Sequence, residues 1–564
     1  MLQTKKADFK QIGARFRIDP VTARIIRNRG IEGEAAIARY LNGTLDDLYD
    51  PMLLKDMERA VSILCEAVDT GKKIRIVGDY DIDGVCSTYI LLQAFERLGS
   101  DVDFEIPDRI KDGYGINESI IEQAHADGVE VILTCDNGIS AFHQVELAKK
   151  YGMTVVITDH HEVPLDGEKE KIPPADAVID PKQADCPYPF PEICGAVVAY
   201  KLVQVLYARR GVPQMEWLDL LEFAAIATVG DVMKLQDENR ILVKYGLKKM
   251  AQTKNLGLRR LAEKNNLDLG AITAYHIGFV IGPCLNAGGR LKTAKEALAL
   301  LRAQSEEEAE RLAEELKELN DTRKDMTEQG TEAAKLQVES WYQKDKVLVV
   351  FLPECHESLA GIIAGRLREY YQKPAIVLTR GEEAVKGSGR SIDEYHMFKK
   401  LTEVSDLLLK FGGHPLAAGL SLEEKNIDEF RRRLNENAGL TEEDFKAKVW
   451  IDVPMPVGYV TERLVRELSC LEPFGQGNEK PLFAEKSLRI RASRVLGRNR
   501  NVVKMTLEET DGHAIEALYF GDGTAFEEER AGRREIDVVY YPDINEYNGR
   551  KTLQAVIRRY KFRG

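Results

Sequence analysis

The chain has 564 residues, of which 44% are hydrophobic and 30% charged, and its formal net charge is -13. This length suggests three or four domains, and the composition excludes collagen, low-complexity disorder and a disulfide scaffold. The mean hydropathy of -0.31 and the lack of an apolar run near ~18 residues argue against a membrane protein. No secretory signal is evident at the N-terminus, so we expect a cytoplasmic location.

The eight cysteines are scattered and form no C-x-x-C pair. This pattern favours buried free thiols over a structural zinc site or a disulfide framework. The negative net charge, taken alone, would argue against nucleic-acid binding, because phosphate binding depends on Lys and Arg. The distribution of charge along the chain matters more than its sum.

The first half of the chain alternates predicted strands with predicted helices. Residues 74–79, 129–135 and 153–159 are short β-branched runs, separated by stretches with helical periodicity. This alternation indicates βαβ units and a largely parallel sheet. From about residue 195 to residue 254 the pattern becomes helical.

A polar stretch divides the chain in its second half. Residues 303–340 are rich in Glu and Lys, with apolar residues at helical spacing. They predict a long solvated helix that bridges two domains. A second α/β unit follows, and from residue 449 onward short β-rich runs with turn signals predict a small barrel or sandwich.

Acidic and imidazole side chains follow several of the predicted strands. The carboxyl ends of parallel strands meet at one edge of a sheet, where open α/β folds bind ligands. A single Asp after a strand is usually a turn residue or a helix N-cap. Four such clusters at one edge would repel one another, and divalent cations would remove that repulsion, so we favour an Mn2+ or Mg2+ site. The clusters after strands are Asp79, Asp81 and Asp83; Asp136; and Asp159, His160 and His161, and Asp231 ends a helical segment.

These blocks carry a resemblance to a known family. GDYDIDG, CDNG, TDHH and VGD resemble the four N-terminal motifs of the DHH phosphoesterase superfamily. GPCLNAGGRL, HESLAGIIAGRL, KGSGRS, FGGHPLAAG and LEPFGQGN resemble the RecJ-type exonucleases, and the likeness covers nearly the whole chain. It implies an α/β fold in which a long helix joins a parallel-sheet DHH domain to a smaller α/β DHH-associated domain, with a C-terminal β-barrel (OB-fold).

The resemblance also implies a division into domains. The expected parts are an N-terminal cap segment (1–50), the DHH catalytic domain (51–300), the connecting helix (301–343), the DHH-associated domain (344–440) and the OB-fold nucleic-acid-binding domain (441–564).

Two Mn2+ or Mg2+ ions per active site are implied as cofactors. Two ions roughly 3.5 to 4 Å apart can activate a water molecule and stabilise the attacking and leaving oxygens of a phosphodiester. Asp136 is expected to bridge them, and with Asp79 and His161 it forms the expected catalytic set. The latter two would orient ligands or meet the scissile phosphate. The implied metal ligands are Asp81, Asp83, Asp136, His160 and Asp231.

Binding the phosphates of a substrate requires positively charged side chains near this edge of the sheet. KGSGRS predicts a Gly-rich loop that holds one phosphate through backbone N–H groups, a hydroxyl and a guanidinium, with a plain turn as the alternative. The resemblance favours a site for a 5′-terminal phosphate. For His356 and His414, an ordinary structural role remains the alternative to substrate binding. The implied substrate-binding residues are Arg109, Arg290, Ser388, Arg390, His356 and His414.

The β-rich region contains the most basic stretch. Residues 486–504 are rich in Lys and Arg and contain no acid, which predicts an electrostatic groove for a nucleic-acid strand. The expected groove residues are Arg489, Arg491, Arg494, Arg498 and Arg500. Tyr519, Tyr540, Tyr541 and Tyr547 are candidates for stacking on bases, with a place in the buried core as the alternative.

The resemblance implies a single-strand-specific 5′ to 3′ DNA exonuclease that releases mononucleotides in recombination and repair. One alternative is a DHH phosphodiesterase for short oligonucleotides or cyclic dinucleotides, which the basic β-rich region disfavours. Another is a non-catalytic relative, which the intact ligand positions disfavour. The implied partners are single-stranded DNA, single-strand-binding protein and a RecQ-type helicase. The chain is expected to be a monomer that does not bind a membrane.

Overall fold

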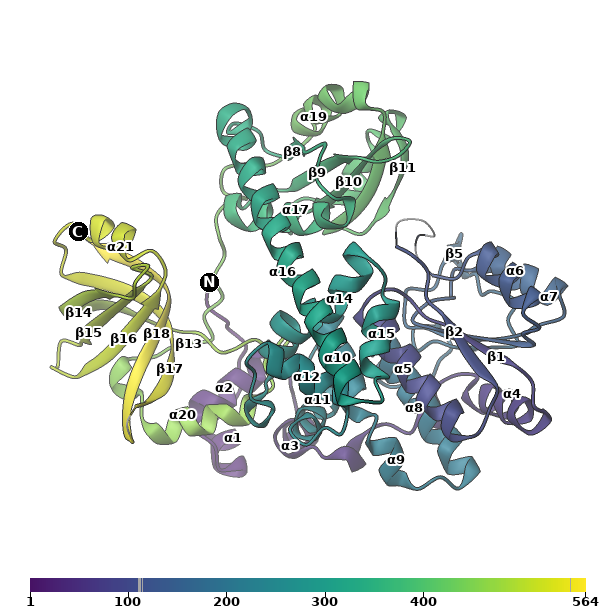
Figure 1. The fold of residues 1–564 in the computed structure, drawn as a ribbon. Coiled ribbons are helices and arrows are strands. Elements are labelled where there is room, and N and C mark those ends of the chain that lie inside the picture. Colours follow the sequence, from purple (N-terminus) through teal and green to yellow (C-terminus); the bar gives the residue numbers. More distant parts are fainter. Residues whose placement is uncertain (110–112, 114, 548) are drawn as a thin grey trace.

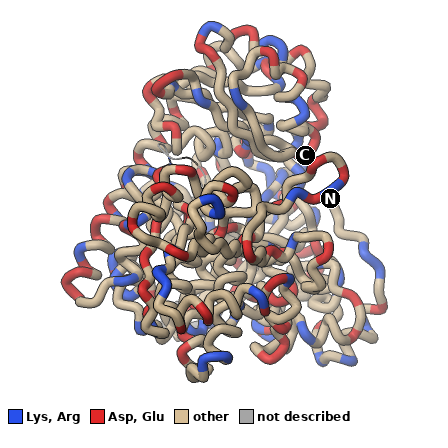
Figure 2. The backbone as a smooth tube through the Cα atoms, turned by 90° about the vertical axis from the view of Figure 1, so that its right-hand side faces the viewer, with Lys and Arg blue, Asp and Glu red and all other residues tan. Residues whose placement is uncertain are grey.

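A computed structural model describes residues 1–109, 113, 115–547 and 549–564. Figure 1 shows three bodies: a large α/β domain at the lower right, a smaller one at the top and a β-barrel at the left. In the view of Figure 2, basic and acidic residues are interspersed along the backbone. Within the described residues, no helix is long and apolar enough to cross a membrane.

The large domain is built on a five-stranded parallel sheet, as the sequence predicts. Its strand order is β2-β1-β3-β4-β7, and each neighbouring pair is parallel. The strands are β1 (Ile74–Val77), β2 (Val102–Glu105), β3 (Val131–Cys135), β4 (Thr154–Thr158) and β7 (Ala177–Ile179). The helices that precede or connect them are α4 (Met57–Thr70), α5 (Ile82–Arg97), α6 (Glu118–Ala126) and α7 (Phe142–Lys150).

A helical layer completes this domain, in agreement with the predicted helical region. Helices α5, α8 and α10 pack against one another in the largest hydrophobic core. The layer comprises α8 (Gly195–Arg210), α9 (Gln214–Leu218), α10 (Leu221–Gly230), α11 (Asp237–Met250), α12 (Leu256–Lys264), α13 (Ala274–His276), a π-helical turn η4 (Ile277–Ile281), α14 (Gly282–Leu291) and α15 (Lys295–Leu301).

Helix α16 (Glu306–Gln337) connects the large domain to the smaller α/β domain (Figure 1). Ser305 caps it by accepting a hydrogen bond from the N–H of Glu308, and acidic residues in its first turn favour the helix dipole. The sequence predicts a solvated helix that bridges two domains. The bridge is confirmed, but one face of the helix is buried. Leu312, Leu316 and Ala334 are buried because α16 packs on α12, α14 and α17 (Glu357–Tyr371).

The smaller α/β domain contains a five-stranded mixed sheet with the order β11-β12-β10-β9-β8. Its strands are β8 (Leu348–Phe351), β9 (Ala375–Arg380), β10 (Val385–Arg390), β11 (Leu408–Gly413) and β12 (Ala417–Leu422), accompanied by α17, α18 (Met397–Thr402) and α19 (Ile427–Glu436). The prediction of a loop at KGSGRS is wrong, because these residues form most of β10. This strand pairs with β9 and β12 on its two sides, so its backbone N–H groups serve the sheet, and the side chains remain to contact a phosphate.

The C-terminal region is a barrel. The strands are β13 (Val453–Pro454), β14 (Phe483–Leu496), β15 (Val502–Glu508), β16 (Ala514–Phe520), β17 (Glu535–Tyr547) and β18 (Arg550–Arg563). Pairing of β14 with β17 closes the sheet. Helices α20 (Glu462–Leu468) and α21 (Gly523–Arg530) also belong to this region and were not predicted from the sequence.

The N-terminal segment belongs structurally to this barrel. It contains α1 (Phe9–Phe16), α2 (Pro20–Asn28) and α3 (Glu34–Asn42). Ile25, Ile26 and Tyr40 share one hydrophobic core with barrel residues such as Val457 and Leu471. The two ends of the chain therefore fold together, which hydrophobic periodicity along the sequence does not reveal.

Candidate metal centre and phosphate pocket

The carboxyl-terminal edge of the parallel sheet brings together acidic clusters that lie far apart in the sequence. Asp79 follows β1, Asp136 follows β3 and His160 follows β4. Asp81 is the N-cap of α5, and Asp231 is the C-cap of α10. Potential ligand atoms lie within 4.8 Å of one another in three groups: Asp83, His160 and Asp231; Asp79, Asp81 and Asp136; and Asp136, His160 and His161.

Two helix N-termini hold the carboxylates of the GDYDIDG block. Asp81 Oδ1 accepts hydrogen bonds from the N–H groups of Asp83 at 3.0 Å and Gly84 at 3.1 Å. The carboxylate of Asp83 accepts from the N–H groups of Gly195 and Ala196, each at 2.7 Å, at the start of α8. The positive ends of α5 and α8 therefore stabilise negative charge at this edge.

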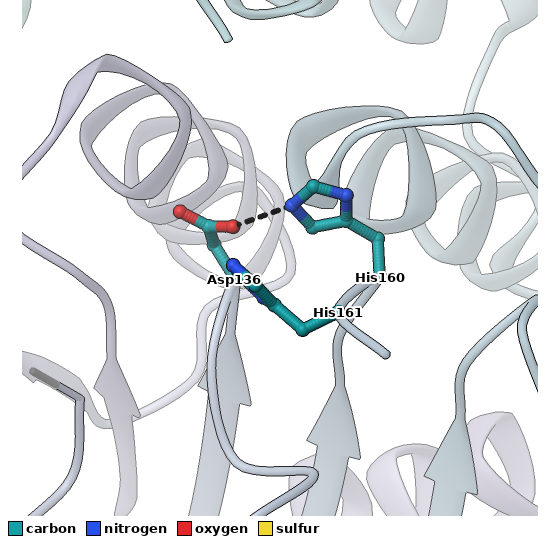
Figure 3. A group of neighbouring side chains, drawn as sticks. All are labelled: Asp136, His160 and His161. Atoms are coloured by element: carbon teal, nitrogen blue, oxygen red, sulfur yellow. Dashed lines mark hydrogen bonds and ion pairs between the residues drawn. The ribbon is translucent and has the colours of Figure 1, made fainter. Parts of the chain in front are cut away.

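Asp136 occupies a strained position at the centre of the site. Its φ of 62° is uncommon for a residue other than Gly and costs of order ~1–3 kcal/mol. Its Oδ1 lies 3.0 Å from His160 Nε2, and Figure 3 shows this carboxylate beside the rings of His160 and His161. A Cβ at Gly195 would lie 2.7 Å from the Asp136 Cβ, so α8 can begin this close to Asp136 because residue 195 is Gly.

Burial and mutual repulsion raise the pKa values of three carboxyl groups. Burial and then the charge of Asp81 raise the pKa of Asp79 to about 8. Burial and then Asp83 raise the pKa of Asp231 to about 8. Burial and then Asp83 also raise the pKa of Asp136 well above its usual value. Carboxylate oxygens with an imidazole nitrogen are a donor set that suits Mn2+ or Mg2+, and such ions would relieve this repulsion, so the residues fit the expected metals.

Asp159 orients the two histidines that follow it. Its Oδ1 accepts from the N–H of His160 at 2.7 Å and lies 2.7 Å from His161 Nδ1, while Oδ2 accepts from the N–H of Ile139. Burial alone would lower the pKa of His161, but the hydrogen bond with Asp159 overcomes it and raises that pKa to about 9. His161 therefore carries a proton at neutral pH. Burial lowers the pKa of His160, as suits a neutral metal ligand.

A cavity of about 410 Å3 opens between the two α/β domains, and it is rich in arginine. Arg109 lies over the Tyr80 ring, 4.9 Å from its centroid. Arg290 donates to the Ser358 carbonyl at 2.9 Å, and burial and then Arg109 lower its pKa to about 10. Arg390 donates to Ser388 Oγ at 3.1 Å. The structure thus brings these four predicted residues together, and a phosphate is the natural ligand of such a cavity.

The two predicted histidines lie elsewhere. His356 is the N-cap of α17, and its Nδ1 lies 2.8 Å from Ser358 Oγ. His414 is exposed in the turn between β11 and β12. Neither is among the described residues that line the cavity.

The predicted groove residues lie on β14 and in the turn that follows it, and all five are exposed. Arg491 forms an ion pair of 2.7 Å with Glu508, and Arg500 donates to Thr524 Oγ1, so these two already have partners. The groove residues on β14 are Arg489, Arg491 and Arg494, and those in the turn are Arg498 and Arg500.

The tyrosine candidates have different surroundings. Tyr540 is fully buried, so it is a core residue. Tyr519 packs against Phe526 and Tyr560. The ring of Tyr541 lies near two cations, with Lys480 Nζ at 3.7 Å and Arg558 at 5.1 Å from its centroid. The Tyr547 side chain lies outside the described part of the structure.

Sequence reasoning missed an exposed aromatic pair near the acidic edge. Tyr275 and Phe279 are 64% and 67% exposed, and their rings stack with centroids 4.7 Å apart. They lie on α13 and η4, and η4 packs on α10. A Cβ at Gly278 of η4 would lie 3.7 Å from Val229, two residues before Asp231. The four-residue spacing of the aromatic pair is the available sequence signal, and it resembles an ordinary buried helix face.

Sequence reasoning also missed Arg366, which lines the cavity. AGIIAGRL has small residues one turn apart on α17, and this spacing is the signal that could have found it. A Cβ at Gly361 would lie 2.9 Å from Ser388 Oγ and 2.8 Å from Arg390 Nη2, so this helix face approaches the cavity closely.

The fold and the acidic edge together define a metal-dependent phosphoesterase. Three domain-family models match the chain: the N-terminal domain of the DHH family at residues 73–228, the DHHA1 domain at 344–439 and the RecJ OB domain at 451–559. The chain is 36% identical over 553 residues to the single-stranded-DNA-specific exonuclease RecJ of Bacillus subtilis, covering 97% of this chain and 69% of that protein.

Solved structures agree with this match. The structure of Thermus thermophilus RecJ in complex with Mn2+ has a TM-score of 0.85 and 28% identity, and the match covers 100% of this chain and 79% of that one. The Mg2+ complex has a TM-score of 0.78 and 27% identity, covering 100% and 78%. The chain belongs to the RecJ family of single-stranded-DNA-specific exonucleases.

Proposed function

We propose that this protein removes mononucleotides from the 5′ end of single-stranded DNA by hydrolysis that depends on two Mn2+ or Mg2+ ions. The observation that carries the proposal is the presence of two neighbouring sites. One consists of three groups of potential metal-ligand atoms, each group within 4.8 Å, and the other is an arginine-rich cavity formed with a second domain. Phosphodiester hydrolysis needs both positive charge on the phosphate and an activated water.

The ligand groups suggest which residues hold each ion. Asp83, His160 and Asp231 form one group, while Asp79 and Asp81 form another, and Asp136 shares the space between them. Asp79 therefore joins the proposed ligands in addition to its expected catalytic role. When bound, two such ions supply an activated water and neutralise charge on the attacking and leaving oxygens.

His161 is positioned to handle a proton during the reaction. Its ring is held by Asp159 through Nδ1, and in the metal-free site, despite burial, the hydrogen bond with Asp159 raises its pKa to about 9. A protonated imidazole beside Asp136 can donate a hydrogen bond to a phosphate oxygen, or a proton to the leaving oxygen. We assign His161 this role.

The arginines of the cavity fix the end of the strand. Arg109 and Arg290 come from the DHH domain, whereas Ser388 and Arg390 come from β10 of the DHHA1 domain. Guanidinium groups bind phosphate oxygens in bidentate fashion. A terminal 5′-phosphate held there places the first internucleotide phosphate toward the metal centre, which supports attack from the 5′ end.

The rest of the strand needs a path away from the metal centre. Stacked and exposed, Tyr275 and Phe279 offer a surface for bases without sequence preference. Arg489, Arg494 and Arg498 of the barrel offer charge for the backbone. His356 and His414 remain predictions, with structural roles that fit their places in the cap and the turn.

The resemblance to RecJ-type exonucleases supports a proposal for the wider context. We assign the enzyme to recombination and repair in the cytoplasm, acting as a monomer with single-strand-binding protein and a RecQ-type helicase as partners. The domain division at residues 50, 300, 343 and 440 is proposed with it.

End-labelled DNA tests the activity. A long single strand labelled at either end is incubated with Mn2+, beside an Asp136→Ala control. Immediate release of the 5′ label as mononucleotide, with the 3′ label kept on shortening strands, is the expected result. Cleavage of dinucleotides with long DNA left intact would instead favour the small-substrate phosphodiesterase.

A further inference from the structure

The segment between α10 and α11 carries Asp231 and has an unusual backbone. Val232 has a φ of 59° and Asp237 a φ of 46°, so residues with left-handed backbone stand near both ends of this short connection. A positive φ is a true outlier for a β-branched residue such as Val232 and costs of order ~1–3 kcal/mol. Such a conformation persists only where surrounding contacts hold it.

Those contacts come from the barrel. The N–H of Leu235 donates to the Gln476 carbonyl at 2.8 Å, and Gln236 Nε2 donates to the Gly477 carbonyl at 2.8 Å. The Leu235 side chain is buried. A Cβ at Gly475 would lie 2.6 Å from Leu235 Cδ1, so the two segments can pack this closely because residue 475 is Gly.

The barrel loop is itself firmly built. Asn478 is 1% exposed. Its Nδ2 donates to the Leu471 and Pro473 carbonyls, each at 2.8 Å, and its Oδ1 accepts from the Tyr40 hydroxyl at 2.8 Å. Arg240 of α11 donates to the carbonyls of Cys470 and Leu471, each at 2.8 Å. Residues 470–478, which we call the docking loop, therefore hold both the connection and the helix that follows it.

We propose that the docking loop is a positioning element for the metal centre, with Gly475 and Gln476 setting the place of Asp231 through Leu235. This inference rests on the proposed role of Asp231 as a metal ligand. It gives the LEPFGQGN block a function that is separate from DNA contact. It also makes the OB domain part of the metal site, so that Mn2+ affinity depends on how this domain is docked.

The test is a steric double-mutant cycle with Mn2+ as the probe. In the metal-free full-length chain, Gly475→Ala should push Leu235 and weaken Mn2+ binding by about 10-fold or more, as loss of supporting contacts around metal ligands commonly does. Leu235→Ala removes the clashing atoms, so the double variant should recover most of the affinity. Isothermal titration calorimetry measures the binding, independently of nuclease activity.

Two further variants complete the design. Gly458→Ala is a matched control in the same domain, because the atoms nearest to its Cβ belong to the Glu509 carboxylate, and it should bind Mn2+ as the wild type does. Gln236→Ala breaks the contact with Gly477 without added bulk and should also weaken Mn2+ binding. This variant still tests the proposal if the Gly475→Ala chain fails to fold.

The outcomes separate the two proposals. Unchanged Mn2+ affinity in Gly475→Ala and Gln236→Ala, or a loss that Leu235→Ala fails to rescue, would overturn the positioning role. If Asp231→Asn also leaves Mn2+ binding unchanged, then the ligand assignment under the proposed function is wrong as well. If Asp231→Asn weakens binding while the docking-loop variants do not, only the further inference fails.

Discussion

Metal binding at the acidic edge should depend steeply on pH. Asp79 and Asp231 have pKa values of about 8 in the metal-free protein, far above the ordinary value of 3.8. At neutral pH each therefore retains a proton that a divalent cation must displace. Raising the pH removes this competition, so the apparent affinity for Mn2+ should rise with pH.

The size of the effect follows from these pKa values. A ligand with a pKa of about 8 is charged in roughly 1% of molecules at pH 6 and in half of them at pH 8, which changes the apparent affinity about 50-fold. Asp79 and Asp231 are two such groups, and the pKa of Asp136 is raised as well. The logarithm of the affinity should therefore rise with a slope of more than about one per pH unit below pH 7.

The stability of the metal-free protein should fall with rising pH, whereas its affinity for Mn2+ should rise. Between the ordinary pKa near 4 and the raised pKa near 8, the folded chain binds more protons at Asp79 and Asp231 than the unfolded chain does. The free energy of unfolding of the metal-free protein should therefore fall as the pH rises through this window. Bound Mn2+ needs the charged carboxylates, so the thermal stabilisation by Mn2+ should grow over the same range.

Calorimetric titration of the metal-free protein with Mn2+ from pH 6 to pH 8 measures the affinity. Repetition in buffers of different ionisation enthalpy counts the protons released. Asp79→Asn removes one of the titrating groups and should lower the proton count by about one. An affinity that is independent of pH, with no proton released, would refute the reasoning that these carboxyl groups hold protons in the metal-free site.

Other parts of the structure give further expectations. Arg390→Ala should reduce the preference for a 5′-phosphorylated over a 5′-hydroxyl strand by about 10- to 100-fold, because a charged hydrogen bond contributes ~1.5–3 kcal/mol; competition between the two strands measures this, and an unchanged preference contradicts the phosphate assignment. Replacing Tyr275 and Phe279 with Ala should weaken binding of single-stranded DNA by ~1–3 kcal/mol per stacked base, while Mn2+ affinity stays constant. Fluorescence anisotropy measures the DNA affinity, and equal values for the variant and the wild type would rule out the stacking surface. Arg29→Ala leaves the buried Asp452 carboxylate, 2.7 Å away, without its main partner, at a cost of ~3–5 kcal/mol; calorimetry should show a lower melting temperature, and an unchanged one would contradict the view that the N-terminal helices stabilise the barrel.

Most of the acidic edge could be predicted because its residues stand next to short sequence patterns that indicate strands. Asp79, Asp136 and Asp159 follow β-branched runs closely, and parallel strands place their carboxyl ends together. Asp231 instead ends a helix. Asp81 and Asp136 could thus be assigned to one site from the sequence. The rule says nothing about backbone strain, so the left-handed conformation of Asp136 was beyond it.

Glycines were harder to interpret. In KGSGRS they indicated a loop, yet Gly387 and Gly389 lie within β10 because neighbours approach too closely for a side chain. A Cβ at Gly387 would lie 2.5 Å from a Leu378 methyl group, and one at Gly389 would lie 3.0 Å from the end of Met397. Tight packing and turns use the same residue type, and the sequence alone does not separate the two.

Contacts between distant segments were also outside the reach of periodicity. Tyr40 and Asn478 meet in one hydrogen bond, although hundreds of residues separate them. Amphipathic patterns predict that each segment buries a face, but they do not identify the partner. The docking loop and the shared core of the two chain ends therefore emerged from the structure.

The bridging helix has a larger role than a linker. The proposed metal ligands lie in the large α/β domain, whereas Ser388 and Arg390 lie in the smaller one. In the proposed function, hydrolysis at a defined phosphate would require a fixed distance between the two. Helix α16 has 32 residues, about 48 Å at the rise of an α-helix, and it packs on α14 and α17 at once. Because α14 carries Arg290 and α17 faces Arg390 through Gly361, this packing fixes both sides of the phosphate cavity. In the proposed function, this helix packing would set the spacing between the terminal phosphate and the metal centre, and a fixed spacing would release one nucleotide at a time without any reading of the bases.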